Sequence, residues 1–337
     1  MNRLHKPADA LSRRVFVRAA LAASAAVSLP AVAQAPATAP AGGARWLVGY
    51  PAGGGADFVT RTVAQGMAPL LGTTIEVVNM PGKGATIAAG EAAKAPADGL
   101  HLFTADNGIL VYNRELFKTL PYDPDKAFSS IGFMARTALF IVASPKAPFK
   151  TIDELLKLPA EQQAKLAYAS PGAGSPHHLA MELFKQQTGL KAEHKPYRGT
   201  GLAMPDVIEG KVPLLVVDAA GGMQAMKAGQ VVPLLSLSGF SVPQFPKVPR
   251  PRDVGQPSIN AFASVGLVVP RATPAEAKAR LSKALLSTLN RRDVAATLLD
   301  AGWESVAGDA LMMDAYMAAE RGIWPKLIRD LKLQVEG

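Results

Sequence analysis

"WLVGYPAGGGADFVTRTVAQGM", residues 46–67, places three consecutive glycines between a short apolar run and a segment with helical periodicity. The apolar run from Trp46 to Tyr50 predicts a strand. After the glycines, apolar residues recur at helical spacing from Val59 to Leu70, and Gly72 is a typical helix stop. This stretch therefore predicts a strand, a glycine turn and a helix, the unit from which α/β proteins are built.

The same alternation of short apolar runs and amphipathic segments continues along the chain, so we expect an α/β fold. The other predicted strands are Ile75–Asn79, Leu100–Thr104, Leu139–Ala143, Lys165–Ala169, Val212–Val217, Val231–Leu237 and Val265–Val269. Two helix starts fit a capping box, Thr151 to Glu154 and Thr273 to Glu276, the second with Pro274 at the first helical position.

A central block has its own series of strands, loops and helices and ends in a proline-rich run from Val242 to Pro257. Such a block inserted into an outer domain needs two crossovers. We therefore expect two lobes, one made of residues 36–139 with 261–337 and the other of residues 140–260.

The N-terminal residues 1–35 have the features of an export signal. Ser12 to Arg18 contains a twin arginine, and the apolar stretch that follows is too short to span a bilayer. Small residues then offer cleavage near Ala33 or Ala35. This predicts a periplasmic protein exported by the twin-arginine or the general secretory route; the alternative is an uncleaved N-terminal anchor.

The composition excludes several classes of function. The chain has no cysteine, which rules out disulfides, thiolate metal sites and a cysteine nucleophile. The formal charge is +9, and removing residues 1–33, with five Lys and Arg and one Asp, leaves 31 basic and 26 acidic residues, or +5. This mild excess suits a small anionic ligand, and without a basic run interleaved with aromatics we expect no nucleic-acid partner.

The usual nucleotide and hydrolase motifs are missing. Lys83 is followed by Gly84, which does not fit a P-loop, and a dinucleotide fingerprint starting at Gly53 would need glycine where the chain has Phe58. Neither a Gly-x-Ser-x-Gly elbow nor a His-Glu-x-x-His helix occurs. We therefore expect no cofactor and no metal, and enzymatic activity becomes less plausible.

Two similar glycine loops are the strongest candidates for a binding site. Ala52-Gly53-Gly54-Gly55-Ala56 and Ser170-Pro171-Gly172-Ala173-Gly174-Ser175 each follow a predicted strand and enter a helix. Glycine lets backbone approach a ligand closely, and free N–H groups at a helix start attract anions. Two such cradles facing each other across a cleft could hold the two ends of a dianion, or each could be an ordinary strand-to-helix turn.

Asp57 follows the first cradle. A carboxylate in the first turn of a helix is favourable, and it can pair with Arg61 four residues later. The alternative is that Asp57 accepts a hydrogen bond from a ligand hydroxyl, an amine or a water.

Further polar residues lie near the second cradle. Ser175 before Pro176 is a typical N-cap, although its hydroxyl could also reach a ligand. His177 and His178 diverge by about 100° on a helix, which makes a poor metal pair and favours structural roles. Asp218, at the end of an apolar strand, could line the site.

The order and spacing of many short markers resemble the Bug-type (Bordetella uptake gene) periplasmic solute-binding receptors of tripartite tricarboxylate transporters. The resemblance covers about residues 46 to 330. The markers include Tyr50–Asp57 with Arg61, Asn79–Gly84, Asp98–Gly99, Leu120–Pro124, Tyr168–Ser170, His178–Ala180, Glu182–Phe184, Pro196–Gly199 and Phe245–Pro249.

The resemblance implies a type II periplasmic-binding-protein (Venus flytrap) fold with two lobes joined by two crossovers. It also implies a monomeric receptor, not an enzyme, that binds a small carboxylate and passes it to transporter membrane subunits. The ligand residues that it implies are Ala52, Gly53, Gly54, Gly55, Asp57, Ser170, Gly174 and Ser175, with Asn107 and Asp218 in the regions that select the distal end.

This chain departs from the family pattern in places. Val78 and Met80 replace two charged residues beside Asn79, and Pro171 and Ala173 replace polar residues of the second loop. We therefore infer no particular acid. Two other functions stay open: a ligand sensor for a signalling system, and an exported hydrolase or isomerase that uses His178 and Asp218.

Overall fold

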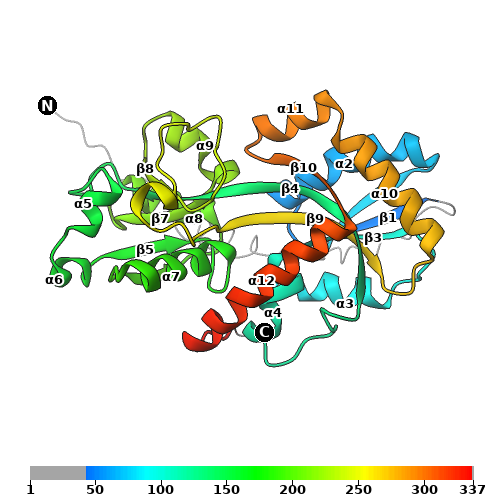
Figure 1. The fold of residues 1–337 in the computed structure, drawn as a ribbon, viewed down its shortest axis with the longest axis horizontal. Coiled ribbons are helices and arrows are strands. Elements are labelled where there is room, and N and C mark those ends of the chain that lie inside the picture. The colour runs from blue at the N-terminus through cyan, green and yellow to red at the C-terminus, as the bar shows by residue number, and fades with distance from the viewer. Residues whose placement is uncertain (1–42, 336–337) are drawn as a thin grey trace, which may run out of the picture. The chain divides into compact units, whose positions relative to one another are not determined.

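The computed structural model describes residues 43–335, and the predicted export signal with its cleavage sites lies outside them. Strands and helices alternate (Figure 1). The strands are β1 Ala44–Val48, β2 Ile75–Asn79, β3 His101–Asp106, β4 Phe128–Ala143, β5 Ala167–Ser170, β6 Glu193–Pro196, β7 Leu214–Asp218, β8 Val232–Ser236, β9 Phe262–Pro270 and β10 Glu304–Asp309. No helix within these residues is long and apolar enough to cross a membrane.

The helices lie between these strands. The α-helices are α2 Gly55–Leu71, α3 Thr86–Lys94, α4 Asn113–Leu116, α5 Ile152–Leu156, α6 Ala160–Gln163, α7 Pro176–Thr188, α8 Thr200–Ile208, α9 Ala219–Lys227, α10 Ala275–Leu289, α11 Arg292–Asp300 and α12 Ala310–Asp330. Short 3₁₀ turns at Lys83–Ala85 (η1) and Pro251–Val254 (η3) and a π-helical turn at Gly108–Tyr112 (η2) complete the described elements.

The strands form a mixed sheet in the order β2-β1-β3-β9-β4-β7-β5-β6, with β8 and β10 also pairing with β4. β1, β2 and β3 are parallel, and so are β5, β6 and β7. Between these two parallel sets run β9 and β4, each antiparallel to its neighbours. The sheet therefore contains two parallel halves joined by an antiparallel pair.

β4 belongs to both halves. Residues 128–138 pair with β9, and residues 139–143 pair with β7. β4 also pairs with β10 through residues 132–136 and with β8 through residues 140–143. Figure 1 shows β4 and β9 side by side between the helix groups. The exact lobe boundaries stay a prediction, and we call residues 36–139 with 261–337 lobe 1 and residues 140–260 lobe 2.

Local sequence patterns account for the helix that carries the first glycine loop. Val59, Val63 and Met67 of α2 are fully buried and pack with α10, whereas Leu70 is 54% exposed. Gly72 ends the helix in the left-handed conformation. The predicted helix and its stop are confirmed.

One of the two predicted capping boxes is confirmed and the other is wrong. Thr151 and Glu154 exchange side-chain-to-backbone hydrogen bonds of 3.2 Å at the start of α5. At α10 the N-cap is the extended Pro274 and the helix begins at Ala275, so Thr273 lies one residue too early to cap it. The buried Thr273 hydroxyl finds no partner among the described residues.

Candidate ligand-binding site

The carboxyl ends of the two parallel strand sets point toward each other. Asp106 at the end of β3 pairs with Val265, which pairs with Ala135 of β4. Asp218 at the end of β7 pairs with Leu139 of β4, from the opposite direction. Ala135 and Leu139, the β4 residues level with the two strand ends, are four positions apart, or about 13 Å along the strand. Loops at both sets of strand ends therefore meet around the crossover.

The first glycine loop leaves amide groups free at the start of α2. Gly54 is the N-cap in an extended conformation and has no side chain to cap the helix. The Gly53 amide donates to Asp57 and the Gly54 amide to the Pro51 carbonyl. No acceptor in the described chain takes the amides of Gly55 and the two residues after it. These free donors lie at the positive end of a 17-residue helix, as an anion site requires.

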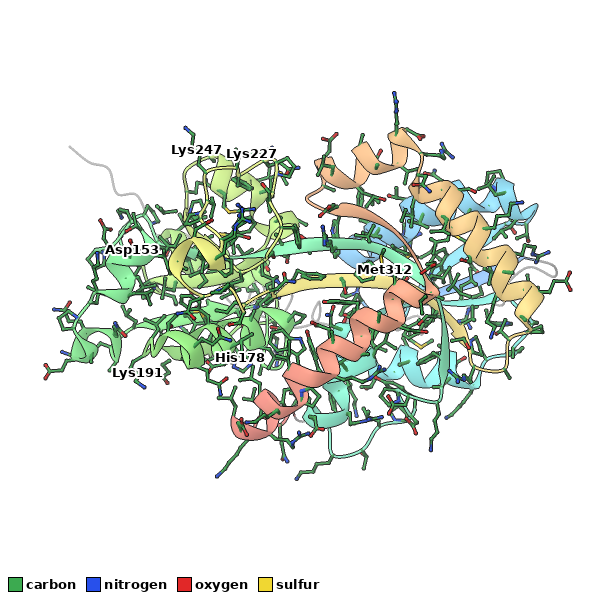
Figure 2. All side chains as sticks on the ribbon, in the orientation of Figure 1. Asp153, His178, Lys191, Lys227, Lys247 and Met312 are labelled. Atoms are coloured by element: carbon green, nitrogen blue, oxygen red, sulfur yellow. The ribbon has the colours of Figure 1, made fainter. Side chains whose placement is uncertain are left out.

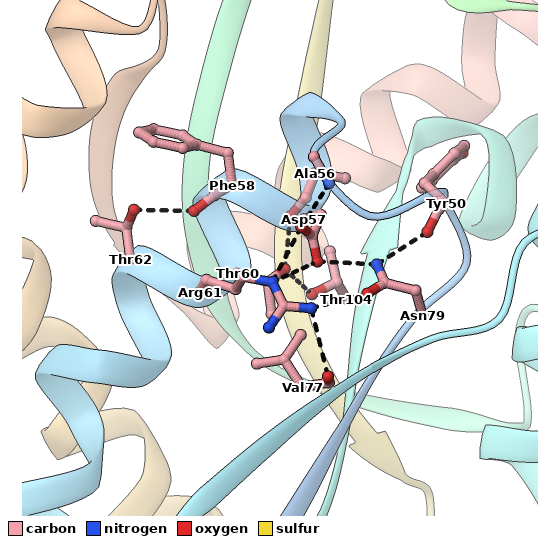
Figure 3. A network of polar contacts seen from close by, with 11 residues as sticks. Tyr50, Ala56, Asp57, Phe58, Thr60, Arg61, Thr62, Val77, Asn79 and Thr104 are labelled. Carbon is pink, nitrogen blue, oxygen red and sulfur yellow. Dashed lines mark hydrogen bonds and ion pairs between the residues drawn. The ribbon is translucent and has the colours of Figure 1, made fainter. Parts of the chain in front are cut away.

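Asp57 holds this loop in place (Figure 3). Its side chain is 3% exposed and accepts hydrogen bonds from the Gly53 amide at 2.9 Å, Arg61 Nε at 2.9 Å and Asn79 Nδ2 at 2.8 Å. Burial alone would raise the pKa of Asp57, but these hydrogen bonds outweigh it and hold that pKa below its ordinary value. The predicted pair with Arg61 is confirmed, and the carboxylate faces protein donors.

The end of β3 is tied to the end of β1. Tyr50 Oη donates to Asp106 Oδ2, and the Ile109 amide donates to Asp106 Oδ1 at 2.9 Å. Burial raises the pKa of Asp106 above its ordinary value despite the hydrogen bond from Tyr50. This contact fixes the loop that follows β3 against the strand that leads into the first glycine loop.

The hydrogen bonds of the Asn107 side chain go to residues outside the candidate set. Its side chain is fully buried, Nδ2 donates to Tyr316 and Glu320 at 2.7 Å each, and Oδ1 accepts from the amide and hydroxyl of Ser264. Every hydrogen-bonding group of the Asn107 amide is therefore used between β3, β9 and α12. We leave Asn107 out of the ligand contacts proposed below.

The second loop differs from the first because its amides are mostly occupied. Ser175 caps α7: its hydroxyl accepts from the His178 amide at 3.3 Å and donates to the Gly172 carbonyl at 2.7 Å. Pro176, at the first helical position, has no N–H. The predicted free N–H groups are present at the start of α2. At the start of α7 that prediction was wrong, because only the amide of His177 is free. The predicted capping role of Ser175 is confirmed.

A pair of stacked histidines supports the second loop. The rings of His178 and His194 lie 3.7 Å apart with an interplanar angle of 10°. His178 Nδ1 accepts from the Gly174 amide at 3.0 Å, and His194 Nε2 lies 2.7 Å from the buried Ser170 hydroxyl. Figure 2 shows His178 on α7. The candidate residues Ser170 and Gly174 thus have partners within lobe 2.

Both stacked rings are held neutral. Burial lowers the pKa of His178 to about 3, and the charges of His194 and Lys185 act in the same direction. Burial also lowers the pKa of His194 to about 4. The predicted structural role of His178 is confirmed, and across residues 43–335 no group of three His, Asp or Glu side chains is arranged to hold a metal ion.

Asp218 caps α9 and binds a histidine. Its Oδ1 accepts from the Gly221 amide at 2.7 Å, and Oδ2 lies 3.0 Å from His177 Nε2. Burial raises the pKa of Asp218, but the hydrogen bond and charge of His177 and the hydrogen bond from the Gly221 amide together outweigh it and leave the pKa lowered. Asp218 therefore pairs with His177 and not with His178.

Sequence reasoning missed a segment that contacts both the first glycine loop and the start of α9. A Cβ atom on Gly55 would lie 2.8 Å from the Trp303 ring, and one on Gly302 would lie 2.6 Å from the Ala220 amide nitrogen of α9. Trp303 in lobe 1 thus packs on the first loop, while its neighbour Gly302 touches the helix that Asp218 caps. No sequence pattern marks residues 302 and 303, because their role depends only on this contact.

Three surface hollows lie away from these loops. They are lined mainly by residues around Glu91 and His101, around Ser129 and Arg271, and around Lys83 and Phe117. None of the three is lined by a candidate residue of either glycine loop, so the strand ends around the crossover remain the candidate site.

Comparison with known proteins identifies the family. A family model described as "Tripartite tricarboxylate transporter family receptor" matches residues 59–333. The chain belongs to this family. BugT of Bordetella pertussis is 25% identical over 321 residues, covering 95% of this chain and 98% of BugT. The resemblance to Bug-type receptors is confirmed.

Solved structures confirm the fold. A Rhodopseudomonas palustris protein with adipate has a TM-score of 0.78 and 26% identity, covering 88% of this chain and 100% of that one. MatC from the same organism with bound malate has a TM-score of 0.74 and 27% identity, covering 86% and 99%. The predicted two-lobed Venus flytrap fold is confirmed, and these family members are binding proteins, not enzymes.

Proposed function

We propose that this receptor is periplasmic, captures a small carboxylate between its two lobes and delivers it to the membrane subunits of a tripartite tricarboxylate-type transporter. We further propose that it acts as a monomer. The observation that carries this proposal is the uncapped start of α2, where free amides meet the positive end of the helix dipole. The adipate and malate bound to structural neighbours support a carboxylate as the ligand.

The first loop supplies much of the binding energy that the proposal needs. Three charge-assisted hydrogen bonds contribute about 5 to 9 kcal/mol before the costs of desolvation and closure. Micromolar affinity corresponds to about 8 kcal/mol. Lobe 2 must therefore add contacts, which agrees with a ligand enclosed by both lobes.

The candidate residues divide into two roles in this proposal. The free amides of Gly55 and the two residues after it donate to the carboxylate, and Ala52, Gly53 and Gly54 form the turn that presents them. Asp57 fixes their geometry, and the partners described above indicate that Ser170, Gly174 and Ser175 shape the second loop. Asp218 contributes through His177.

Two substitutions at Gly54 test the α2 amides. Its extended backbone accepts any residue, although a Cβ would lie 3.2 Å from the Pro51 carbonyl. In Gly54→Asp the new carboxylate caps the free amides and excludes an anionic ligand, which should slightly raise the stability of the unliganded protein and abolish binding. Gly54→Ala adds the same Cβ without an acceptor and should keep binding.

The assay is a thermal shift with malate, adipate, tricarboxylates, aromatic acids and amino acids. A ligand at a hundred times its Kd adds about 2.7 kcal/mol of stability. The proposal fails if phosphorylated compounds stabilise the protein and no carboxylate does. The α2 assignment fails if Gly54→Asp binds as tightly as Gly54→Ala.

A further inference from the structure

His177 has a buried ring nitrogen without a partner. The residue is 8% exposed at the second position of α7, and its Nε2 is engaged by Asp218 at 3.0 Å. Its Nδ1 contacts no hydrogen-bonding group in the described residues. By contrast, His178 and His194 use a ring nitrogen to hold the second loop. A buried polar atom left unpaired is costly, and a bound molecule beside it can supply the missing partner.

The position of His177 points to the ligand. Its backbone amide is the free one at the start of α7, and its partner Asp218 caps α9. The start of α9 touches Gly302, whose neighbour Trp303 packs on Gly55 of the first loop. His177 is therefore linked to the first glycine loop through Asp218, the start of α9 and residues 302 and 303.

The Asp218 carboxylate determines what Nδ1 can do. It engages Nε2 and leaves Nδ1 without a protein partner in the described chain, beside the free His177 amide. A ligand carboxylate at Nδ1 is bound through an N–H on each ring nitrogen, and Asp218 balances the positive ring that such binding requires. The Nδ1–H and the His177 amide both fit an oxygen acceptor, and a carboxylate oxygen most strongly.

We infer that His177 is a ligand-contacting residue, oriented by Asp218, that selects acids carrying a second carboxylate at the end away from α2. The inference rests on the proposed function. Asp218 is then a positioning residue. The sequence predicted that Asp218 itself would face the distal end of the ligand, whereas here His177 contacts the second carboxylate.

Two substitutions separate the ring nitrogens. In His177→Gln the side-chain amide reaches about as far as Nε2 and can still bond Asp218, but nothing replaces Nδ1. In His177→Asn a polar atom replaces Nδ1 and the bond to Asp218 is lost. His101→Gln is the matched control, because His101 also pairs with an aspartate, Asp98, outside the site.

Binding is measured by calorimetry with acids matched in length: adipate, 6-hydroxyhexanoate and hexanoate, and malate with 2-hydroxybutyrate. Wild type should prefer the dicarboxylates at least tenfold. His177→Gln should lose the preference for dicarboxylates and bind the mono-acids with unchanged affinity. His177→Asn should keep part of the preference, and His101→Gln should keep all of it. A 6-hydroxyhexanoate affinity equal to that of adipate would show that a hydroxyl suffices and overturn the choice of a carboxylate.

The outcomes distinguish the inference from the proposed function. If wild type binds none of these or other carboxylates, the proposed function fails. If wild type binds dicarboxylates and His177→Gln binds them equally well, only the inference about His177 fails. Equal losses for both classes of acid would show a structural role for His177 and also overturn it.

Trp303 supports a second inference on independent grounds. Trp46 donates its indole N–H to Thr104 at 2.9 Å and Trp324 donates to Glu320 at 2.7 Å, whereas Trp303, 6% exposed, has no acceptor in the described chain. Its Nε1 would lie 3.2 Å from a Cβ on Gly55. We infer that this N–H, which can only donate, adds a side-chain contact to the carboxylate at α2.

Trp303→Phe and Trp46→Phe form the matched pair for this test, since each removes an indole N–H and the same volume. Trp303→Phe should weaken the binding of mono-acids and of dicarboxylates alike, by about tenfold in Kd. Trp46→Phe should lower the Tm of the unliganded protein more, because it breaks a hydrogen bond, and leave affinity unchanged. Unchanged affinity in Trp303→Phe would overturn the assignment.

Discussion

Acidification should destabilise this receptor through the histidine stack under its second loop. His178 is 2% exposed and its pKa is lowered to about 3, against about 6.5 in an unfolded chain. Below pH 6.5 the unfolded chain therefore binds a proton that the folded chain does not. The stability contributed by neutral His178 is complete above pH 6.5 and is lost as the pH falls toward 3. At pH 5 the loss is about 2 kcal/mol.

The neighbouring His194 acts in the same direction with a smaller effect, because it is partly exposed and its pKa is lowered to about 4. Asp106 and Glu320 oppose it, since burial raises their pKa values and protonation relieves that penalty. These groups remain in a His178→Asn variant, in which the shorter amide can still accept from the Gly174 amide but does not titrate.

The comparison isolates His178. Urea unfolding of wild type and His178→Asn at pH 7 and pH 5 gives four free energies of unfolding, and wild type should lose about 2 kcal/mol more than the variant between the two pH values. The other titrating groups cancel in this difference. Equal losses in the two proteins would refute the assignment of a neutral, proton-excluding His178.

Two further stability predictions concern the loops. Asp57→Asn should lower the free energy of unfolding by about 3 kcal/mol, because all partners of Asp57 are donors and the new NH₂ would face one of them. The control is Asp293→Asn, which breaks the exposed ion pair with Arg291 and should change that free energy by less than about 0.5 kcal/mol. Similar losses in both variants, measured by urea unfolding, would contradict the Asp57 network. Gly174→Ala should destabilise more than Gly229→Ala, since both glycines have positive φ but only at Gly174 would the Cβ meet a side chain, Leu116 at 2.8 Å; equal Tm values would disprove that contact.

Much of the fold follows from local patterns. Val59, Val63 and Met67 identify the buried face of α2, and Thr151 with Glu154 identifies the start of α5. The first half of β4, β6 and β10 were missed. β6 is largely exposed, and β4 carries polar residues where it crosses from one half of the sheet to the other, so neither shows a simple apolar run.

The sequence by itself determined the α/β class, the glycine loop at the start of α2, the Asp57–Arg61 pair and the Ser175 cap. Each depends on residues within a few positions of one another, so propensity and spacing decide it. Tertiary structure alone decided that Asn107 is used up in the core, that His178 takes the Gly174 amide, and that Trp303 meets Gly55. These outcomes depend on which distant side chains supply donors and acceptors, and on space that a Cβ would fill. Neither can be predicted from the spacing of residues along the chain.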